Sequence, residues 1–157
     1  MTEPQESPVG SEERIRSDAW RQYFETSQML LNKLEQLLRK DTALRLADYD
    51  VCQLLYHAKD RRLRLGDIAH EMVFSPSRLS YQVGVLCEKG ILRRIEDTTD
   101  GRAAFAELTS HGVQVFLEAQ EIHKRHVGDM FNGLVSLEEA ETVESVFTRV
   151  RKVLRRG

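Results

Sequence analysis

The spacing of apolar residues divides the chain into helical stretches around a short central region of different character. Apolar positions run at helical intervals through Arg14–Arg39 and predict a long first helix, since no proline or glycine interrupts it. Shorter patterns of the same kind predict helices over Asp48–Ala58 and Asp67–Val73. Two long amphipathic stretches follow, over Ser110–Leu134 and from Leu137 onward.

Capping residues mark the ends of several of these helices. Ser75 followed by proline predicts a further helix over Pro76–Lys89, because serine is a favoured N-cap and proline suits the first helical position. Gly90 is a typical stop for that helix. Similar start signals precede the last two helices, at Thr109 and in the capping box of Ser136 and Glu139.

The central region also carries the β-prone residues. Ile91–Glu96 and Ala103–Leu108 predict two strands on either side of a turn at Asp97–Gly101, which is the pattern of a β-hairpin. A short extended piece is expected at Leu63–Leu65. The fold class is therefore mainly α, with a small β-hairpin.

The elements suggest a disordered leader and one domain. Residues 1–13 are rich in proline, serine and glutamate and are expected to be disordered, and residues 14–157 form a single domain. The outer helices, at 14–40 and 110–157, have apolar stripes that need partners, so they predict a homodimer. Residues 42–109 form the compact lobe between them.

The lobe has the layout of a helix-turn-helix, with Asp67–Val73 as the support helix and Pro76–Lys89 as the recognition helix. Leu79, Val83 and Leu86 would anchor the recognition helix to the core. Its other face carries groups that contact bases and phosphates, although the same residues also suit an ordinary solvated surface. They are Ser77, Arg78, Ser80, Tyr81 and Gln82.

The hairpin strengthens the interpretation as a DNA-binding lobe. Its tip holds Asp100-Gly101-Arg102, and its first strand carries Arg93 and Arg94. An arginine at a hairpin tip suits the narrow minor groove of DNA, with Asp100 holding the guanidinium in place. The alternative is an exposed ion pair in a turn, which contributes little.

The formal net charge of −2 is weak evidence against nucleic-acid binding, but binding needs only a basic face, and charge is segregated along the chain. Acidic residues collect at the N-terminus and in the last helix, and arginines collect in the middle. The central arginines are Arg61, Arg62, Arg64, Arg78, Arg93, Arg94 and Arg102.

Other classes of function find little support. The chain lacks a nucleophile motif and a phosphate-binding glycine loop, so we expect no enzyme and no cofactor. His123 and His126 lie three residues apart, but an exposed polar face explains them better than a metal site. Cys52 and Cys87 are interpreted as buried free thiols, with a redox switch as the alternative. Without a signal segment or an apolar run of about 20 residues, a cytoplasmic location is expected.

The segment Leu63–Gly112 resembles the MarR family of winged helix-turn-helix regulators. The resemblance rests on the combined spacing of several short motifs, which also extends to both flanks of the segment. The motifs are Tyr49-Asp50-Val51, Ile68-Ala69, Ser75-x-Ser77-x-Leu79-Ser80, Leu86-Cys87-Glu88-Lys89-Gly90-Ile91-Leu92-Arg93-Arg94, Asp100-x-Arg102, Leu108-Thr109-x-x-Gly112 and Leu134-x-Ser136-x-Glu138-Glu139.

The resemblance implies a homodimer that binds a pseudo-palindromic operator, represses genes and responds to a small effector. It assigns DNA contacts to Ser75, Ser77, Arg78, Ser80, Tyr81, Gln82, Arg93, Arg94, Asp100 and Arg102. Gly101 departs from the family, which often has a second arginine there.

The resemblance also implies an effector pocket between the dimer helices and the DNA-binding lobe. The aromatic candidates for it are Trp20, Tyr23, Phe24, Tyr49 and Tyr56, and each also suits a core or an interface. These residues do not identify the effector. The alternative function is a helical homodimeric interaction module whose winged fold has lost specific DNA binding.

Overall fold

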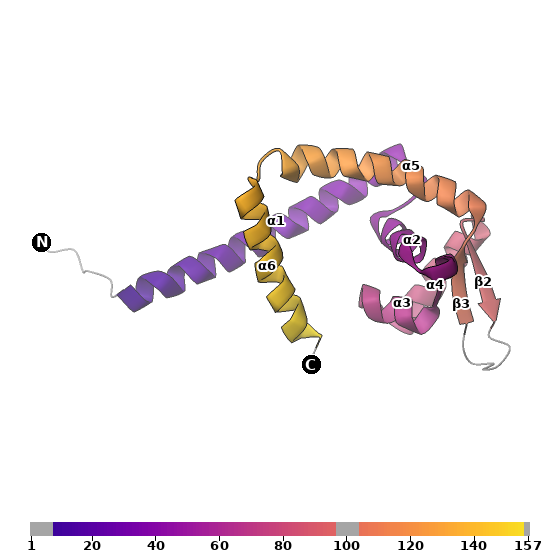
Figure 1. Cartoon of the computed structure of the whole chain (residues 1–157), viewed down its shortest axis with the longest axis horizontal. Coiled ribbons are helices and arrows are strands. Elements are labelled where there is room, and N and C mark those ends of the chain that lie inside the picture. The colour runs from indigo at the N-terminus through magenta and orange to yellow at the C-terminus, as the bar shows by residue number, and fades with distance from the viewer. Residues whose placement is uncertain (1–7, 97–103, 156–157) are drawn as a thin grey trace, which may run out of the picture.

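The computed structural model describes residues 8–96 and 104–155. Long helices form one part of the fold, and a lobe of short helices and strands forms the other (Figure 1). The elements are α1 (Pro8–Asp41), α2 (Leu46–His57), β1 (Arg62–Arg64), α3 (Leu65–Met72), α4 (Pro76–Glu88), β2 (Leu92–Glu96), β3 (Ala104–Leu108), α5 (Ser110–Val127) and α6 (Leu137–Leu154).

Most predicted elements are confirmed, and two boundaries differ from the prediction by more than two residues. The first helix begins at Pro8, so residues 8–13, which we expected to be disordered, are helical, and residues 1–7 lie outside the described part. At the other end, α5 stops at Val127 and a π-helical turn over Gly128–Asn132 replaces its expected last turns.

The wing contains one strand more than the predicted hairpin. The strands β2 and β3 pair antiparallel, with Leu92 opposite Leu108 and Arg93 opposite Glu107. The extended piece expected near Leu63 is β1, which pairs with the other side of β3. The sheet order is therefore β1-β3-β2, and β3 is its central strand.

The two halves of the fold meet at α2. Figure 1 shows α1 extending away from the lobe as a long rod, with α5 running above α2 and α6 crossing α1 in this view. The ring of Tyr23 on α1 lies 4.3 Å from that of Phe147 on α6, which joins the outer helices within one chain. The rings of Tyr49 on α2 and Phe116 on α5 lie 5.4 Å apart in the core.

The recognition helix packs as its pattern predicted. Leu79, Val83 and Leu86 are buried, because their spacing of four and three residues places them on one face of α4. They join a core that also contains Val51 of α2 and Ile68 of α3. The polar residues near the start of α4 therefore face outward.

A tight joint connects the start of α5 to the segment that precedes β2. The Thr109 hydroxyl accepts a hydrogen bond from the Gly112 amide (2.9 Å) and donates one to the Gly90 carbonyl (2.6 Å). Gly90 itself has a left-handed backbone, with φ of 69°. A Cβ atom at Gly112 would lie 2.1 Å from the Ile91 carbonyl oxygen, so only glycine fits there.

We expect Gly112→Ala to lower the free energy of unfolding by about 3 kcal/mol or more, because the added methyl group forces α5 away from the Ile91 backbone. Urea denaturation followed by circular dichroism measures the change. Gly84→Ala is the matched control: a Cβ there meets nothing within 4 Å, and alanine favours the helix by about 1 kcal/mol. Equal effects of the two substitutions would contradict this account of the joint.

Candidate nucleic-acid interface

A three-residue turn sets the position of the recognition helix. Val73 ends α3 in the left-handed conformation, with φ of 54°, and its side chain is 89% exposed. The Phe74 amide donates to the Ala69 carbonyl (2.9 Å), which closes the end of α3. A β-branched residue is strained in this conformation, so packing on both sides of the turn must hold it.

The first two turns of α4 present small hydroxyls and a large aromatic ring to solvent. Ser75 caps the helix by accepting a hydrogen bond from the Arg78 amide (3.3 Å), and its hydroxyl also lies 3.3 Å from that of Ser77. Ser77 and Ser80 are exposed, and Tyr81 is 77% exposed. These side chains and the helix N-terminus together form a polar surface of the kind that contacts phosphates and base edges.

Arg78 is positioned by the turn that precedes it. Its guanidinium carbon lies 3.8 Å from the centre of the Phe74 ring, in a cation–π contact. The contact restricts a side chain that would otherwise lose much rotamer freedom on binding. No sequence signal singled out Phe74, because an aromatic residue in a turn is equally suited to core packing.

Gln82 does not face outward as expected. Its amide donates a hydrogen bond to the Asp48 carboxylate of α2 (3.1 Å) and is only partly exposed. Asp48 is buried and also accepts a hydrogen bond from the Arg45 amide (3.1 Å). A buried carboxylate needs partners, and this need draws Gln82 toward the lobe interior.

The arginines of the wing are paired within the sheet. Arg93 is bound to Glu107 on the facing strand, and Arg94 lies 3.2 Å from Glu96. The predicted tip residues, Asp100 and Arg102, lie outside the described residues.

The edge strand of the wing adds basic residues that the prediction of DNA contacts did not include. Arg62 and Arg64 lie over the Phe105 ring, with guanidinium carbons 5.1 and 5.2 Å from its centre. The one sequence signal that could have predicted Arg62 and Arg64 as candidates was their place in the central group of arginines.

Comparison with known proteins places this fold in a family. No protein-family model matches the sequence. The structure of AbsC, a MarR family transcriptional regulator from Streptomyces coelicolor, matches with a TM-score of 0.84 and 28% identity, over 90% of this chain and 95% of AbsC. A second MarR family regulator from the same organism, solved in complex with DNA, gives a TM-score of 0.84 and 27% identity over 88% of this chain and 87% of its own. In fold and in sequence the chain is thus similar to transcriptional regulators of the MarR family.

Two further proteins are similar to this chain, one in sequence and one in fold. The chain is 28% identical to the transcriptional regulator MhqR of Bacillus subtilis over 103 residues, a stretch that covers 66% of this chain and 69% of MhqR. An organohalide-sensing regulator bound to 2,4-dichlorophenol shares the fold, with a TM-score of 0.75 and 16% identity over 97% of this chain and 88% of its own. The regulators at 27–28% identity are therefore the proteins that this chain resembles in both fold and sequence. Within the residues described, no helix is long and apolar enough to span a membrane.

The five aromatic residues predicted for an effector pocket separate into two groups in this MarR-family fold. Trp20, Tyr23 and Phe24 stack on one another along α1 and are largely exposed. Tyr49 and Tyr56 instead pack against Phe116.

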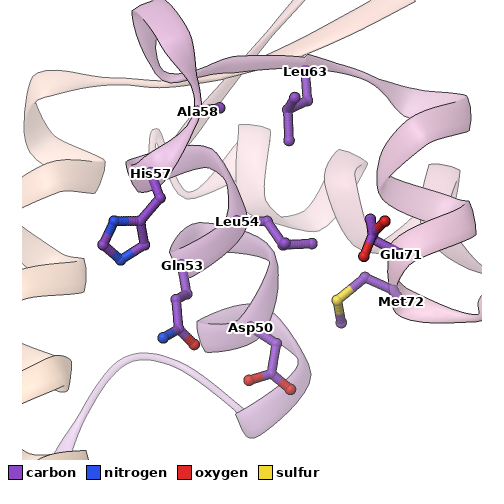
Figure 2. Close-up of a pocket in the computed structure, with 8 residues that line it drawn as sticks. All are labelled: Asp50, Gln53, Leu54, His57, Ala58, Leu63, Glu71 and Met72. Atoms are coloured by element: carbon purple, nitrogen blue, oxygen red, sulfur yellow. The ribbon is translucent and has the colours of Figure 1, made fainter. Parts of the chain in front are cut away.

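Two open cavities lie beside α2, and none of the five aromatic residues lines either one. The larger has a volume of about 510 Å³ and lies between α2, β1 and α3 (Figure 2). The smaller has a volume of about 370 Å³ and lies between α1, α2 and the start of α4, where Arg78 lines it. Asp50 and Met72 line both.

Burial changes the ionisation of groups on α2 and α5. It raises the pKa of Asp50 to about 6 and, with the charge of Asp50 as a smaller cause, that of Tyr49 to about 12. Burial also lowers the pKa of His123, whose ring stacks on Tyr49 at 4.5 Å. The neighbouring His126 lies 3.3 Å from Asp41 instead of facing a common metal.

The cysteines lie where thiolate chemistry is disfavoured. Cys52 is fully buried, and burial raises its pKa to about 12. Burial is also the main cause that raises the pKa of the partly exposed Cys87. Both are free thiols, and their environment favours the protonated form.

We expect Asp50→Asn to stabilise the fold at pH 7.5 by on the order of 1 kcal/mol, allowing for solvent screening. The folded-state pKa of Asp50 is raised, so ionisation above about pH 6 disfavours folding, while below about pH 4 the carboxyl is neutral in both states. Thermal unfolding at pH 4 and 7.5 measures the difference. A gain of the same size at both values would show that Asp50 ionisation is not its cause.

Proposed function

We propose that this chain is a homodimeric, ligand-responsive repressor that binds a pseudo-palindromic operator. The observation that carries the proposal is the exposed polar surface at the start of α4, held in place by the buried face of the same helix. In this proposal residues 42–109 bind DNA, and the helices at 14–40 and 110–157 form the dimer.

The outer helices support the dimer. Large apolar side chains on α1 and α6 are exposed in the single chain, among them Trp20 at 62% and Val153 at 70%. Exposed apolar residues on this scale mark an interaction surface, and a second copy supplies a self-complementary partner. Tyr23 and Phe147 already join α1 to α6, so the same surface can continue into the partner chain.

Base and phosphate contacts are assigned to the exposed face of α4 and to the wing. Ser75, Ser77, Arg78, Ser80 and Tyr81 are suited to the major groove. Asp100 and Arg102 are assigned to the minor groove from the sequence pattern. Arg93 and Arg94 are paired with carboxylates in the free protein, so phosphate contact requires them to exchange partners.

A change of spacing between the two lobes accounts for a ligand response. Two recognition helices must lie about 34 Å apart to bind adjacent half-sites on one side of DNA. A ligand bound beside α2 acts only through its different affinities for the DNA-competent state and another state. A protein of the same fold binds 2,4-dichlorophenol, which supports a small organic effector.

Gel-shift titration against the promoter region of the chain's own gene tests specific DNA binding. We expect Arg78→Ala and Arg102→Ala each to weaken binding by about tenfold or more. If either arginine binds a phosphate, its replacement also lowers the number of counterions released on binding by about one, which reduces the slope of log affinity against log salt concentration. Arg125→Ala is the control, because Arg125 is exposed on α5, which lies across α2 from the helix-turn-helix.

The proposal of a repressor would be rejected if the chain binds DNA weakly and without sequence preference, and if both arginine variants behave like the wild type. That result would favour the alternative function, a helical interaction module without specific DNA binding. The exposed apolar faces of α1 and α6 are the observation that keeps this alternative open.

Sedimentation equilibrium tests the dimer. We expect twice the chain mass of 18.1 kDa for the wild type and for Gln22→Glu, but dissociation of Trp20→Glu, because a charge is costly in an apolar interface. Gln22→Glu adds the same charge to an exposed polar position of α1. A monomeric wild type, or a dimer that Trp20→Glu does not weaken, would contradict the assignment of this face.

A further inference from the structure

The cavity between α2, β1 and α3 has the size of a small-molecule site. Its volume of about 510 Å³ lies within the range of about 300–1,000 Å³ that such sites occupy. Figure 2 shows Leu54 of α2 and Met72 of α3 extending toward each other across it, with Leu63 of β1 above them. These apolar walls suit a ligand with an apolar body.

One carboxylate at this cavity differs from its acidic neighbours, which all have partners. Asp48 is bound by Gln82, and Glu35 accepts a hydrogen bond from the Leu46 amide (2.7 Å). Glu71 at the cavity is bound by Arg155 of the C-terminal segment (2.6 Å). Asp50 makes no hydrogen bond or ion pair with any residue that the structure describes, although it is partly buried.

The charges around the cavity disfavour an anionic ligand. Asp50 and Glu71 contribute carboxylates, and Gln53 contributes an amide. His57 is the lining side chain that can carry a positive charge, and no lysine or arginine lines the cavity in the described chain. A cation therefore meets an attractive field there, whereas a carboxylate ligand meets repulsion.

We infer that the effector of this regulator is an organic cation, an amine whose apolar body fills this cavity and whose ammonium group donates to the Asp50 carboxylate. The inference rests on the proposed function, because it names the class of molecule to which the regulator responds. It also explains why a costly, partly buried carboxylate on α2 has no partner within the described chain: the ligand supplies one.

The position of the cavity connects such a ligand to the recognition helix. Met72 is the last residue of α3 and separates this cavity from the smaller one, which Phe74 and Arg78 line. A ligand that displaces Met72 therefore acts on the turn that positions Arg78. On the other side, Glu71 connects α3 to the end of α6 through Arg155, so the same ligand also acts on the contact between the lobe and an outer helix.

Calorimetry on the full chain with matched probes tests the inference. The probes are one- and two-ring arylmethylamines, the corresponding arylmethanols and the corresponding arylcarboxylates, at pH 7.5. We expect amines to bind at least about tenfold more tightly than alcohols or carboxylates of equal size, and Asp50→Asn to remove that advantage. Glu118→Gln changes the net charge equally at an exposed site on α5 and should leave binding unchanged.

Asparagine has nearly the shape of aspartate, and a melting curve at pH 7.5 shows that the variant is folded. Absence of binding by every amine, equal binding by the carboxylates, or an amine affinity that survives Asp50→Asn overturns the inference. These outcomes leave operator binding and dimerisation untouched, since those are measured without ligand. If amines bind at Asp50 but never change operator affinity, the assignment of an effector is overturned, and the ligand response of the proposed function fails with it.

Discussion

The packing of α2 in the centre of the chain is the constraint on which the other features depend. Val51, Cys52 and Leu55 are fully buried, and Tyr49 is held between Phe116 and His123. Because α5 covers one side of this helix and α3 and the sheet lie on another, the outer helices and the winged lobe share a single core. Any movement of one half against the other must therefore occur at the surfaces of α2, which is where both cavities are found.

The two acidic residues of α2, Asp48 and Asp50, differ in whether their burial is compensated by hydrogen bonds. Asp48 is almost completely enclosed, but the Arg45 amide and Gln82 compensate for its burial. Asp50, two residues later, faces the cavities and has a pKa of about 6 because burial is not compensated there. A helix that stabilises the fold through one carboxylate thus keeps a second one available at an opening.

Local patterns predicted the fold well where a residue's own chemistry decides the structure. Ser75-Pro76, Thr109 and the Ser136 capping box each begin a helix in the structure, and Leu79, Val83 and Leu86 are buried as their spacing indicated. Local patterns could not predict features that depend on contacts between residues far apart in the sequence. Whether Gln82 faces solvent depends on Asp48, 34 residues away, and the cavities depend on how α2 and α3 approach each other. The surroundings of the aromatic residues also depend on tertiary contacts, since Tyr49 and Tyr56 both pack against Phe116 of α5.

In the proposed function, the hydrogen bond between Gln82 and Asp48 separates the residues of α4 that are assigned to DNA from those that support the helix. Gln82 lies on the same helix as the exposed serines, yet a buried carboxylate on another helix determines where its amide points. A substitution at Asp48 would release that amide and alter the set of groups that α4 offers to base edges. Under the proposed function, operator preference can therefore diverge through replacements inside the lobe, at a buried position away from the proposed DNA-binding surface.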